Sequence, residues 1–123
     1  QGFCRMEATG LEYYSGDDGL NFAWLAHGAS GMVSVVAHAD AHSWREMITE
    51  VDAGDLPGAR AVAQRMRPLV GAIMGGGQGA VMAKEALLLQ GRIPSAALRL
   101  PLVRASAEEV AALREALAAS GLL

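Results

Sequence analysis

The residues of this chain best suited to chemistry form the turn Ser15-Gly16-Asp17-Asp18, at the end of a predicted strand. The turn places a glycine and two carboxylates where a predicted strand ends and a helix begins. In parallel α/β folds, ligands bind at that end of a strand. Asp17 and Asp18 could act as an acid–base pair, but adjacent carboxylates point in different directions, so capping of the next helix is the preferred interpretation.

Lys84 is the single lysine of the chain and a second candidate, because a lysine amine can form a Schiff base with a carbonyl substrate. It falls within a predicted helix beside Glu85, remote from the Gly16 turn. A surface or capping role is therefore favoured over a catalytic one.

The remaining candidates are weaker. His38 and His42 have the i, i+4 spacing of a metal-binding pair, with Asp40 between them, but no third ligand is evident, so no metal site is predicted. The run Gly75-Gly76-Gly77 is not followed by the Lys-Ser/Thr of a phosphate-binding loop, so it is interpreted as a break between helices.

Two short strands are expected to position the turn. Residues 11–15 predict the first strand, and a helix begins at Asp17 or Asp18 and ends at about His27, where Gly28 stops it. The near-continuous apolar run from Met32 to Val36 predicts a second strand of the kind that a parallel sheet buries on both faces.

Helices are expected elsewhere. Residues 3–9 predict the end of a helix closed by Gly10, and Ser106 with Glu109 predicts a capping box. The other predicted helices cover residues 39–53, 55 to about 74, 80–90 and 106–120. Two strands are too few for a stable parallel sheet, so the strand pair is expected to need neighbours from outside this sequence.

Composition limits the function classes. The chain has 123 residues, of which 52% are hydrophobic, enough for one domain with a core. A net charge of −3 does not provide the basic surface of a nucleic-acid-binding protein. Cys4 is the single cysteine, which excludes an intrachain disulfide and fits a cytoplasmic location, and neither a signal peptide nor a membrane span is predicted.

Several segments together resemble the dihydrodipicolinate synthase family of pyruvate-dependent class I aldolases. They include Tyr14 to Asp18, residues 25–35, Lys84 to Leu87, and residues 98–102 with the ending Leu113 to Leu123. The resemblance covers residues 10–123. It implies an α/β fold in which this chain is the C-terminal portion of a (β/α)8 barrel followed by an all-helical domain. Residues 1–53 would be the end of helix 6 and βα units 7 and 8, and residues 54–123 the C-terminal helical domain.

The resemblance also implies an activity. The family condenses pyruvate with aspartate semialdehyde through a lysine Schiff base, without a cofactor, in lysine and diaminopimelate biosynthesis. The Schiff-base lysine and the tyrosine proton relay of the family precede the region matched here, so this chain alone is expected to be inactive. The family further implies a homo-oligomer, commonly a tetramer, or association with an N-terminal half.

Three positions carry over to the substrate pocket by resemblance. Gly16 matches a pocket-lining glycine, Val33 matches a residue whose backbone contacts pyruvate, and Asp17 would support the turn. The segment Val36-Ala37-His38 departs from the Thr-Ala-Asn common in the family. Alternatives are a related pyruvate aldolase such as N-acetylneuraminate lyase, and a non-catalytic helical interaction module or truncated remnant.

Overall fold

The computed structural model describes residues 10–76 and 78–123, so the helix expected at residues 3–9 lies outside the described residues. Its elements, in chain order, are β1 (Tyr14–Ser15), α2 (Asn21–Ala26), β2 (Gly31–Met32), the 3-10 helix η2 (Val36–His38), α3 (Ala41–Asp52), α4 (Leu56–Met74), α5 (Gly79–Leu89) and α6 (Ala107–Ala119).

The two strands form a parallel pair connected by α2. Tyr14 lies opposite Gly31, and Ser15 lies opposite Met32. Both strands are shorter than predicted. The second one stops early because the backbone N–H groups of Val35 and Val36 turn away to the carboxylate of Asp18, and the chain then enters η2.

The start of α2 corrects another prediction. Neither Asp17 nor Asp18 caps this helix, whose N-cap is Leu20 without a side-chain hydrogen bond. Asp17 instead accepts from the N–H of Gly19, and Asp18 is used by the segment after β2. The predicted stop is confirmed, since Gly28 has a φ of 87° that side-chain-bearing residues rarely adopt.

The four longer helices agree with the predicted ranges to within one or two residues, because their ends carry local signals. The Asp55 side chain accepts from the N–H of Gly58 and caps α4. The predicted capping box is present, since Ser106 and Glu109 bond reciprocally at the start of α6.

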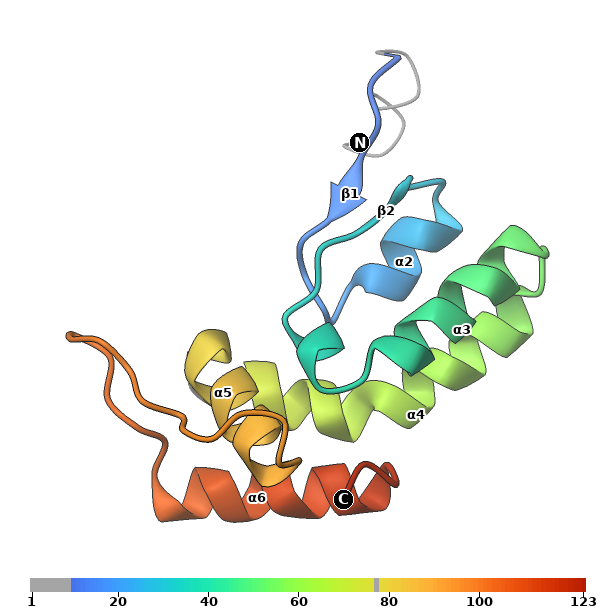
Figure 1. Cartoon of the computed structure of the whole chain (residues 1–123). Helices are drawn as coiled ribbons and strands as arrows, with labels where there is room; N and C mark the ends of the chain where they lie inside the picture. Colours follow the sequence, from blue (N-terminus) through green and yellow to red (C-terminus); the bar gives the residue numbers. More distant parts are fainter. Residues whose placement is uncertain (1–9, 77) are drawn as a thin grey trace.

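The long helix α4 is the centre of the helical layer. It packs against α3 along much of its length and also contacts α2, α5 and α6 (Figure 1). Its apolar face is buried in the core, with Val62, Met66, Leu69 and Ile73 at most 3% exposed. Trp44 and Met47 reach this core from α3, and Leu113 and Leu117 from α6.

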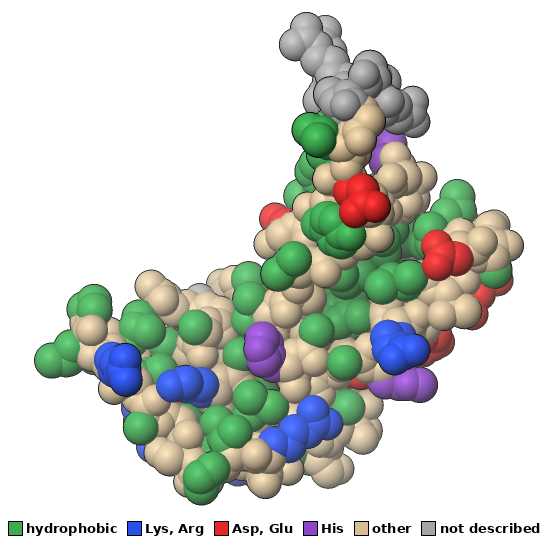
Figure 2. Space-filling model, turned by 45° about the horizontal axis from the view of Figure 1, so that its top comes forward, with side chains coloured by type: hydrophobic (Ala, Val, Ile, Leu, Met, Phe, Trp, Pro, Cys, Tyr) green, Lys and Arg blue, Asp and Glu red, His purple; other side chains and the backbone are tan. Residues whose placement is uncertain are grey.

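The β1–α2–β2 unit stands on one side of this helical layer (Figure 1). Several large hydrophobic side chains of the unit are exposed, among them Leu11, Tyr14, Leu20 and Val33. Figure 2 shows hydrophobic side chains over this unit and in the hollow where it meets the helices. None of the described helices combines the length and apolarity needed to cross a membrane.

Candidate functional site

The carboxyl ends of the two parallel strands form the candidate site. Gly16 follows β1 and Val33 follows β2, and the Val33 N–H donates to the carbonyl oxygen of Ser15 over 2.7 Å. This hydrogen bond keeps Gly16 and Val33, the two positions predicted to line the substrate pocket, next to each other at the carboxyl ends of the strand pair. The Val33 side chain is 71% exposed, and a Cβ added to Gly16 would meet no atom within 4 Å.

Asp17 lies on the exposed side of the turn. Its Oδ1 accepts from the N–H of Gly19 over 2.9 Å, a short-range contact within the turn itself. The Ser15 hydroxyl also lies against the Asp17 backbone, 3.3 Å from its carbonyl oxygen. These bonds fix the conformation of the chain directly after Gly16.

Asp18 is the residue that sequence reasoning assigned wrongly. Its side chain is buried and reaches across to the segment after β2, where it accepts from the Ser34 hydroxyl and from two backbone N–H groups. Those N–H groups belong to Val35 and Val36, at 3.0 and 3.3 Å. The sequence signal was the doubled aspartate, but Ser34, Val35 and Val36 lie 16–18 residues from Asp18, so these partners cannot be read from local spacing.

A buried polar network extends from Asp18 beneath the site. The amide nitrogen of Asn21 donates to Asp18 over 3.2 Å, and its amide oxygen accepts from the Ser15 hydroxyl over 2.5 Å. Ser34 in turn accepts from the N–H of Ala37 over 2.9 Å. The network connects both strand ends, so it can hold backbone groups at fixed positions for a small polar ligand.

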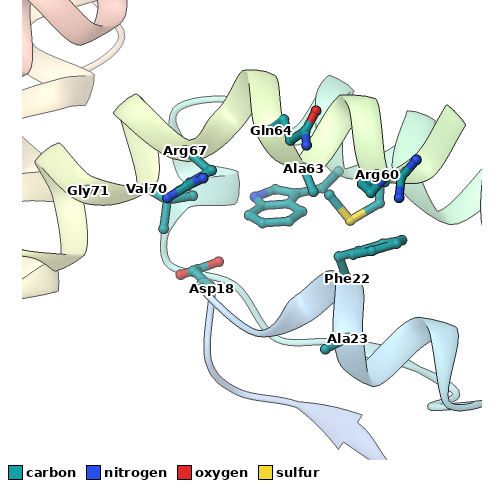
Figure 3. Close-up of a pocket in the computed structure, with 12 residues that line it drawn as sticks. Asp18, Phe22, Ala23, Arg60, Ala63, Gln64, Arg67, Val70 and Gly71 are labelled. Carbon is teal, nitrogen blue, oxygen red and sulfur yellow. The ribbon is translucent and has the colours of Figure 1, made fainter. Parts of the chain in front are cut away.

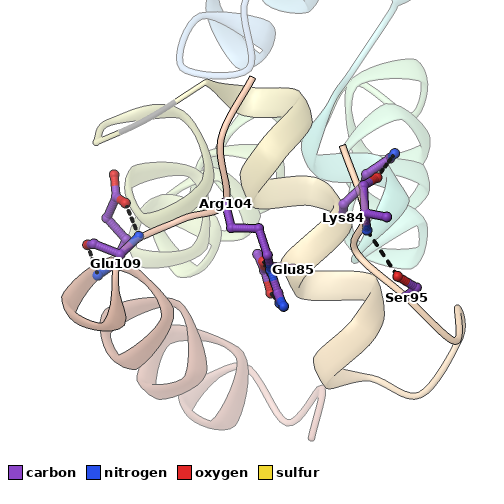
Figure 4. Close-up of polar contacts among 7 residues, drawn as sticks. Lys84, Glu85, Ser95, Arg104 and Glu109 are labelled. Atoms are coloured by element: carbon purple, nitrogen blue, oxygen red, sulfur yellow. Dashed lines mark hydrogen bonds and ion pairs between the residues drawn. The ribbon is translucent and has the colours of Figure 1, made fainter. Parts of the chain in front are cut away.

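Lys84 lies on α5, outside this site. Its ammonium group donates to the carbonyl oxygen of Ala97 over 2.7 Å, which agrees with the surface role favoured from the sequence. The neighbouring Glu85 is buried, and its carboxylate accepts from Nε and Nη2 of Arg104, at 2.9 and 3.0 Å (Figure 4). These contacts attach the irregular segment 92–105 to α5.

The histidines also have local contacts. The Nδ1 atom of His38, in η2, lies 2.9 Å from the carbonyl oxygen of Val35, and His42 is exposed on α3. Among the described residues, no three His, Cys, Asp or Glu side chains lie together in a way that could hold a metal ion.

Comparison with known families gives a match over nearly the whole chain. Residues 4–120 match the profile of the Dihydrodipicolinate synthetase family. A 4-hydroxy-tetrahydrodipicolinate synthase from Kineococcus radiotolerans is 51% identical over 95% of this chain, and one from Bifidobacterium longum is 42% identical over 97%. The chain spans 38% and 40% of the length of these two relatives.

Solved structures give the same result for the fold. The dihydrodipicolinate synthase of Thermotoga maritima superposes with a TM-score of 0.87 at 38% identity, covering 91% of this chain and 37% of the other. The enzyme of Cyanidioschyzon merolae, solved with lysine bound, gives a TM-score of 0.89 at 34% identity, covering 98% and 41%.

Proposed function

Because the chain belongs to the dihydrodipicolinate synthetase family, we propose that it is the C-terminal part of a lyase that condenses pyruvate with aspartate semialdehyde. The product would serve lysine and diaminopimelate biosynthesis. The single observation that carries the proposal is the juxtaposition of Gly16 and Val33 at the carboxyl ends of two hydrogen-bonded parallel strands. This is the edge at which parallel α/β enzymes bind their substrates.

In this proposal, the chain supplies one wall of the pyruvate pocket. Gly16 leaves space beside the substrate, the backbone at Val33 contacts it, and Asp17 supports the turn. A lysine amine from the preceding part of the protein attacks the keto carbon of pyruvate, and loss of water gives an iminium. Loss of a methyl proton gives the enamine, whose carbon then bonds to the aldehyde carbon of the second substrate. This chain alone has no condensation activity in the proposal.

The proposed whole protein is a (β/α)8 barrel. Residues 1–53 contribute the end of helix 6 and units 7 and 8, and residues 54–123 form the C-terminal helical domain. Each strand has one hydrogen-bonded neighbour in the described part of the chain, so its other edge can pair with a further barrel strand. We extend the proposal to a cytoplasmic homo-oligomer that uses no cofactor.

A chimera tests the proposal. The part of the Kineococcus radiotolerans relative that precedes the matched region is joined to this chain, and condensation of pyruvate with aspartate semialdehyde is measured. We expect activity, and a borohydride-trapped pyruvate adduct on a lysine of the preceding part. The isolated chain should give neither. A well-folded chimera without activity, or an adduct on Lys84 of the isolated chain, would contradict the proposal and favour a non-catalytic helical module.

The role of Gly16 has its own test. A Gly16→Ala substitution adds a Cβ into open space, and its φ is not positive, so the stability of the isolated chain should change little. In the chimera, the same methyl group enters the proposed pocket, and KM for pyruvate should rise about tenfold or more. Gly76→Ala is the matched control, because a Cβ added there also has space, its nearest atom being a Glu109 side-chain oxygen 4.0 Å away. An unchanged KM would remove Gly16 from the pocket and leave the barrel proposal standing.

A further inference from the structure

One buried carboxylate connects the two strand ends that form the candidate site. Asp18 lies two residues after Gly16, in the turn that follows β1. Across the strand pair, its hydrogen-bond donors come from residues 34–36, which directly follow Val33. The separation between Gly16 and Val33 therefore depends on this side chain as well as on the pairing of the strands.

The backbone at Val33 is held on both sides. Its own N–H donates to the Ser15 carbonyl oxygen over 2.7 Å. The next residue, Ser34, donates its hydroxyl to Asp18 and accepts from the Ala37 N–H over 2.9 Å. The peptide group between Val33 and Ser34 lies between these two fixed points, so the direction of the Val33 carbonyl oxygen depends on the Asp18–Ser34 bond. Because the Val33 N–H is used by Ser15, this oxygen is the polar backbone atom with which Val33 can contact a substrate.

The same carboxylate holds the turn on the other side of the site. The Asn21 amide nitrogen donates to Asp18 over 3.2 Å, and the Asn21 amide oxygen accepts from the Ser15 hydroxyl over 2.5 Å. Ser15 and Asn21 are at most 1% exposed, so water does not compete for these bonds. Gly16 lies between Ser15 and Asp18 in the chain, and both of its flanking segments are fixed.

Packing from α4 contributes less to the position of Asp18 than these hydrogen bonds do. On the side towards α4, Asp18 borders a cavity of about 600 Å³, which also extends along α2 and α3. Figure 3 shows Arg67 and Val70 of α4 opposite Asp18. With space on this side, loss of a hydrogen-bond donor should allow the segment after β2 to move.

We propose that Asp18 is a positioning residue for the condensation: through Ser34, it fixes the direction of the Val33 carbonyl group and the distance of this group from Gly16. The inference rests on the proposed function, which assigns Gly16 and Val33 to the pyruvate pocket. Asp18 does not contact the substrate, since protein donors occupy both of its carboxylate oxygens. Displacement of a pocket wall by about 1 Å can reduce the rate of an enzyme by about two orders of magnitude, so such a residue matters to the reaction.

A matched pair of substitutions separates positioning from folding. In the chimera, Ser34→Ala removes the hydroxyl that bonds to Asp18, whereas Ser34→Thr keeps a hydroxyl. Each protein is incubated with increasing pyruvate, the adduct is trapped with borohydride, and its amount is measured by mass spectrometry. We expect Ser34→Ala to raise the half-saturating pyruvate concentration about fivefold or more, and Ser34→Thr to leave it nearly unchanged. A purely structural role would instead lower the maximal amount of adduct without changing the half-saturating concentration.

A double variant connects the effect to Asp18. Asp18→Asn should also raise the half-saturating concentration, and Asp18→Asn with Ser34→Ala should raise it by less than the product of the two single effects, because both substitutions remove the same bond. Effects that multiply would show that Ser34 acts independently of Asp18 and would overturn the proposal. If the Asp18 variants do not fold, the comparison of the two Ser34 variants still decides the outcome.

Hydrogen exchange in the whole 123-residue chain reports on the same bond without any activity. The N–H groups of Ser30 and Val33 donate across the strand pair at its two ends, each over 2.7 Å. Ser34→Ala should speed exchange of the Val33 amide about fivefold or more relative to the Ser30 amide, whereas Ser34→Thr should not.

The possible outcomes distinguish this proposal from the proposed function. An unchanged half-saturating concentration in the Ser34→Ala chimera, or an equal rise in both Ser34 variants, would overturn the positioning role, although adduct formation by the parent chimera would still support the proposed function. A parent chimera without an adduct would overturn the proposed function. In that case, hydrogen exchange of Val33 would still show whether the Asp18–Ser34 bond holds the strand end, and equal exchange in both Ser34 variants would refute it.

Discussion

Two neighbouring aspartates of the Gly16 turn have opposite environments. Asp17 is exposed and accepts one hydrogen bond at short range, whereas Asp18 is buried and accepts from a hydroxyl, a side-chain amide and two backbone N–H groups. A buried carboxylate with so many donors fixes the backbone around it, since each donor would otherwise be left unsatisfied. Asp18 therefore determines where β2 ends and η2 begins.

Substitution of Asp18 tests this role. Asp18→Asn replaces one acceptor oxygen with an NH₂ group. In either orientation of the amide, this group would face a hydrogen-bond donor. We expect the free energy of unfolding, measured by urea denaturation, to fall by about 2–4 kcal/mol. Asp17→Asn is the matched control and should cost under about 1 kcal/mol, because it affects one exposed bond. Equal losses for the two variants would refute the assigned role of Asp18.

Tyr14 gives a pH-dependent prediction. Its hydroxyl donates to the Glu12 carboxylate over 3.2 Å, and this bond, together with the negative charge of Glu12, raises the pKa of Tyr14 above its ordinary value. The protonated phenol is the form that the fold favours, so its contribution to stability is complete below about pH 10 and is lost as the pH rises through the folded-state pKa.

Ultraviolet titration of the tyrosines checks this prediction. In a Glu12→Gln variant, the pKa of Tyr14 should fall back towards its ordinary value, because the neighbouring charge is gone. Glu108→Gln, at the exposed start of α6, is the control and should leave the titration curve unchanged. A Glu12→Gln curve that overlays the wild-type curve would show that the contact has no effect on ionisation.

At the scale of elements, the capping box of α6 makes a separable contribution to stability. Ser106→Ala removes the acceptor for the Glu109 N–H and should lower the free energy of unfolding by about 1 kcal/mol. Ser120→Ala, at the other end, removes a hydroxyl that donates to the Ala116 carbonyl oxygen, a contact of little value to a helix. Thermal unfolding followed by circular dichroism should separate the two variants. Equal midpoints would contradict a capping role for Ser106.

The elements that could be predicted from the sequence are those whose own residues mark their faces and ends. The helices α3 to α6 have apolar faces at helical spacing, and caps such as Asp55, Ser106 and Gly54 mark their ends. The strand ends and the start of α2 could not be predicted, because they depend on where the Asp18 carboxylate finds its partners.

Gly16 and Val33, the residues proposed to line the pocket, illustrate a further limit. Their proximity follows from two strands being parallel neighbours, which the apolar pattern of the second strand already indicated. Their assignment to pyruvate comes from the family resemblance. A glycine and a valine carry no chemistry of their own, so no property of these side chains could have pointed to a keto-acid substrate.

For the whole molecule, the β1–α2–β2 unit and the helical layer differ in how they are stabilised. The helices share a buried core, whereas the strands are two residues long and expose Leu11, Tyr14 and Val33. An isolated two-stranded pair is marginal in water. The Asp18 network and the contacts of α2 with α3 and α4 are what attach the unit to the rest of the described chain.

This difference predicts unequal hydrogen exchange. In the isolated chain, amides of residues 11–19 and 28–34 should exchange about tenfold or more faster than those in the buried turns of α4, because local opening of the strand pair breaks few contacts. In the chimera with the preceding part of the Kineococcus radiotolerans relative, further strands should cover the pair and slow its exchange to the rate of α4. Mass spectrometry of peptides from both proteins measures the rates. Slow exchange of the pair in the isolated chain would mean that the strands need no neighbours, which would remove the physical argument for an incomplete barrel.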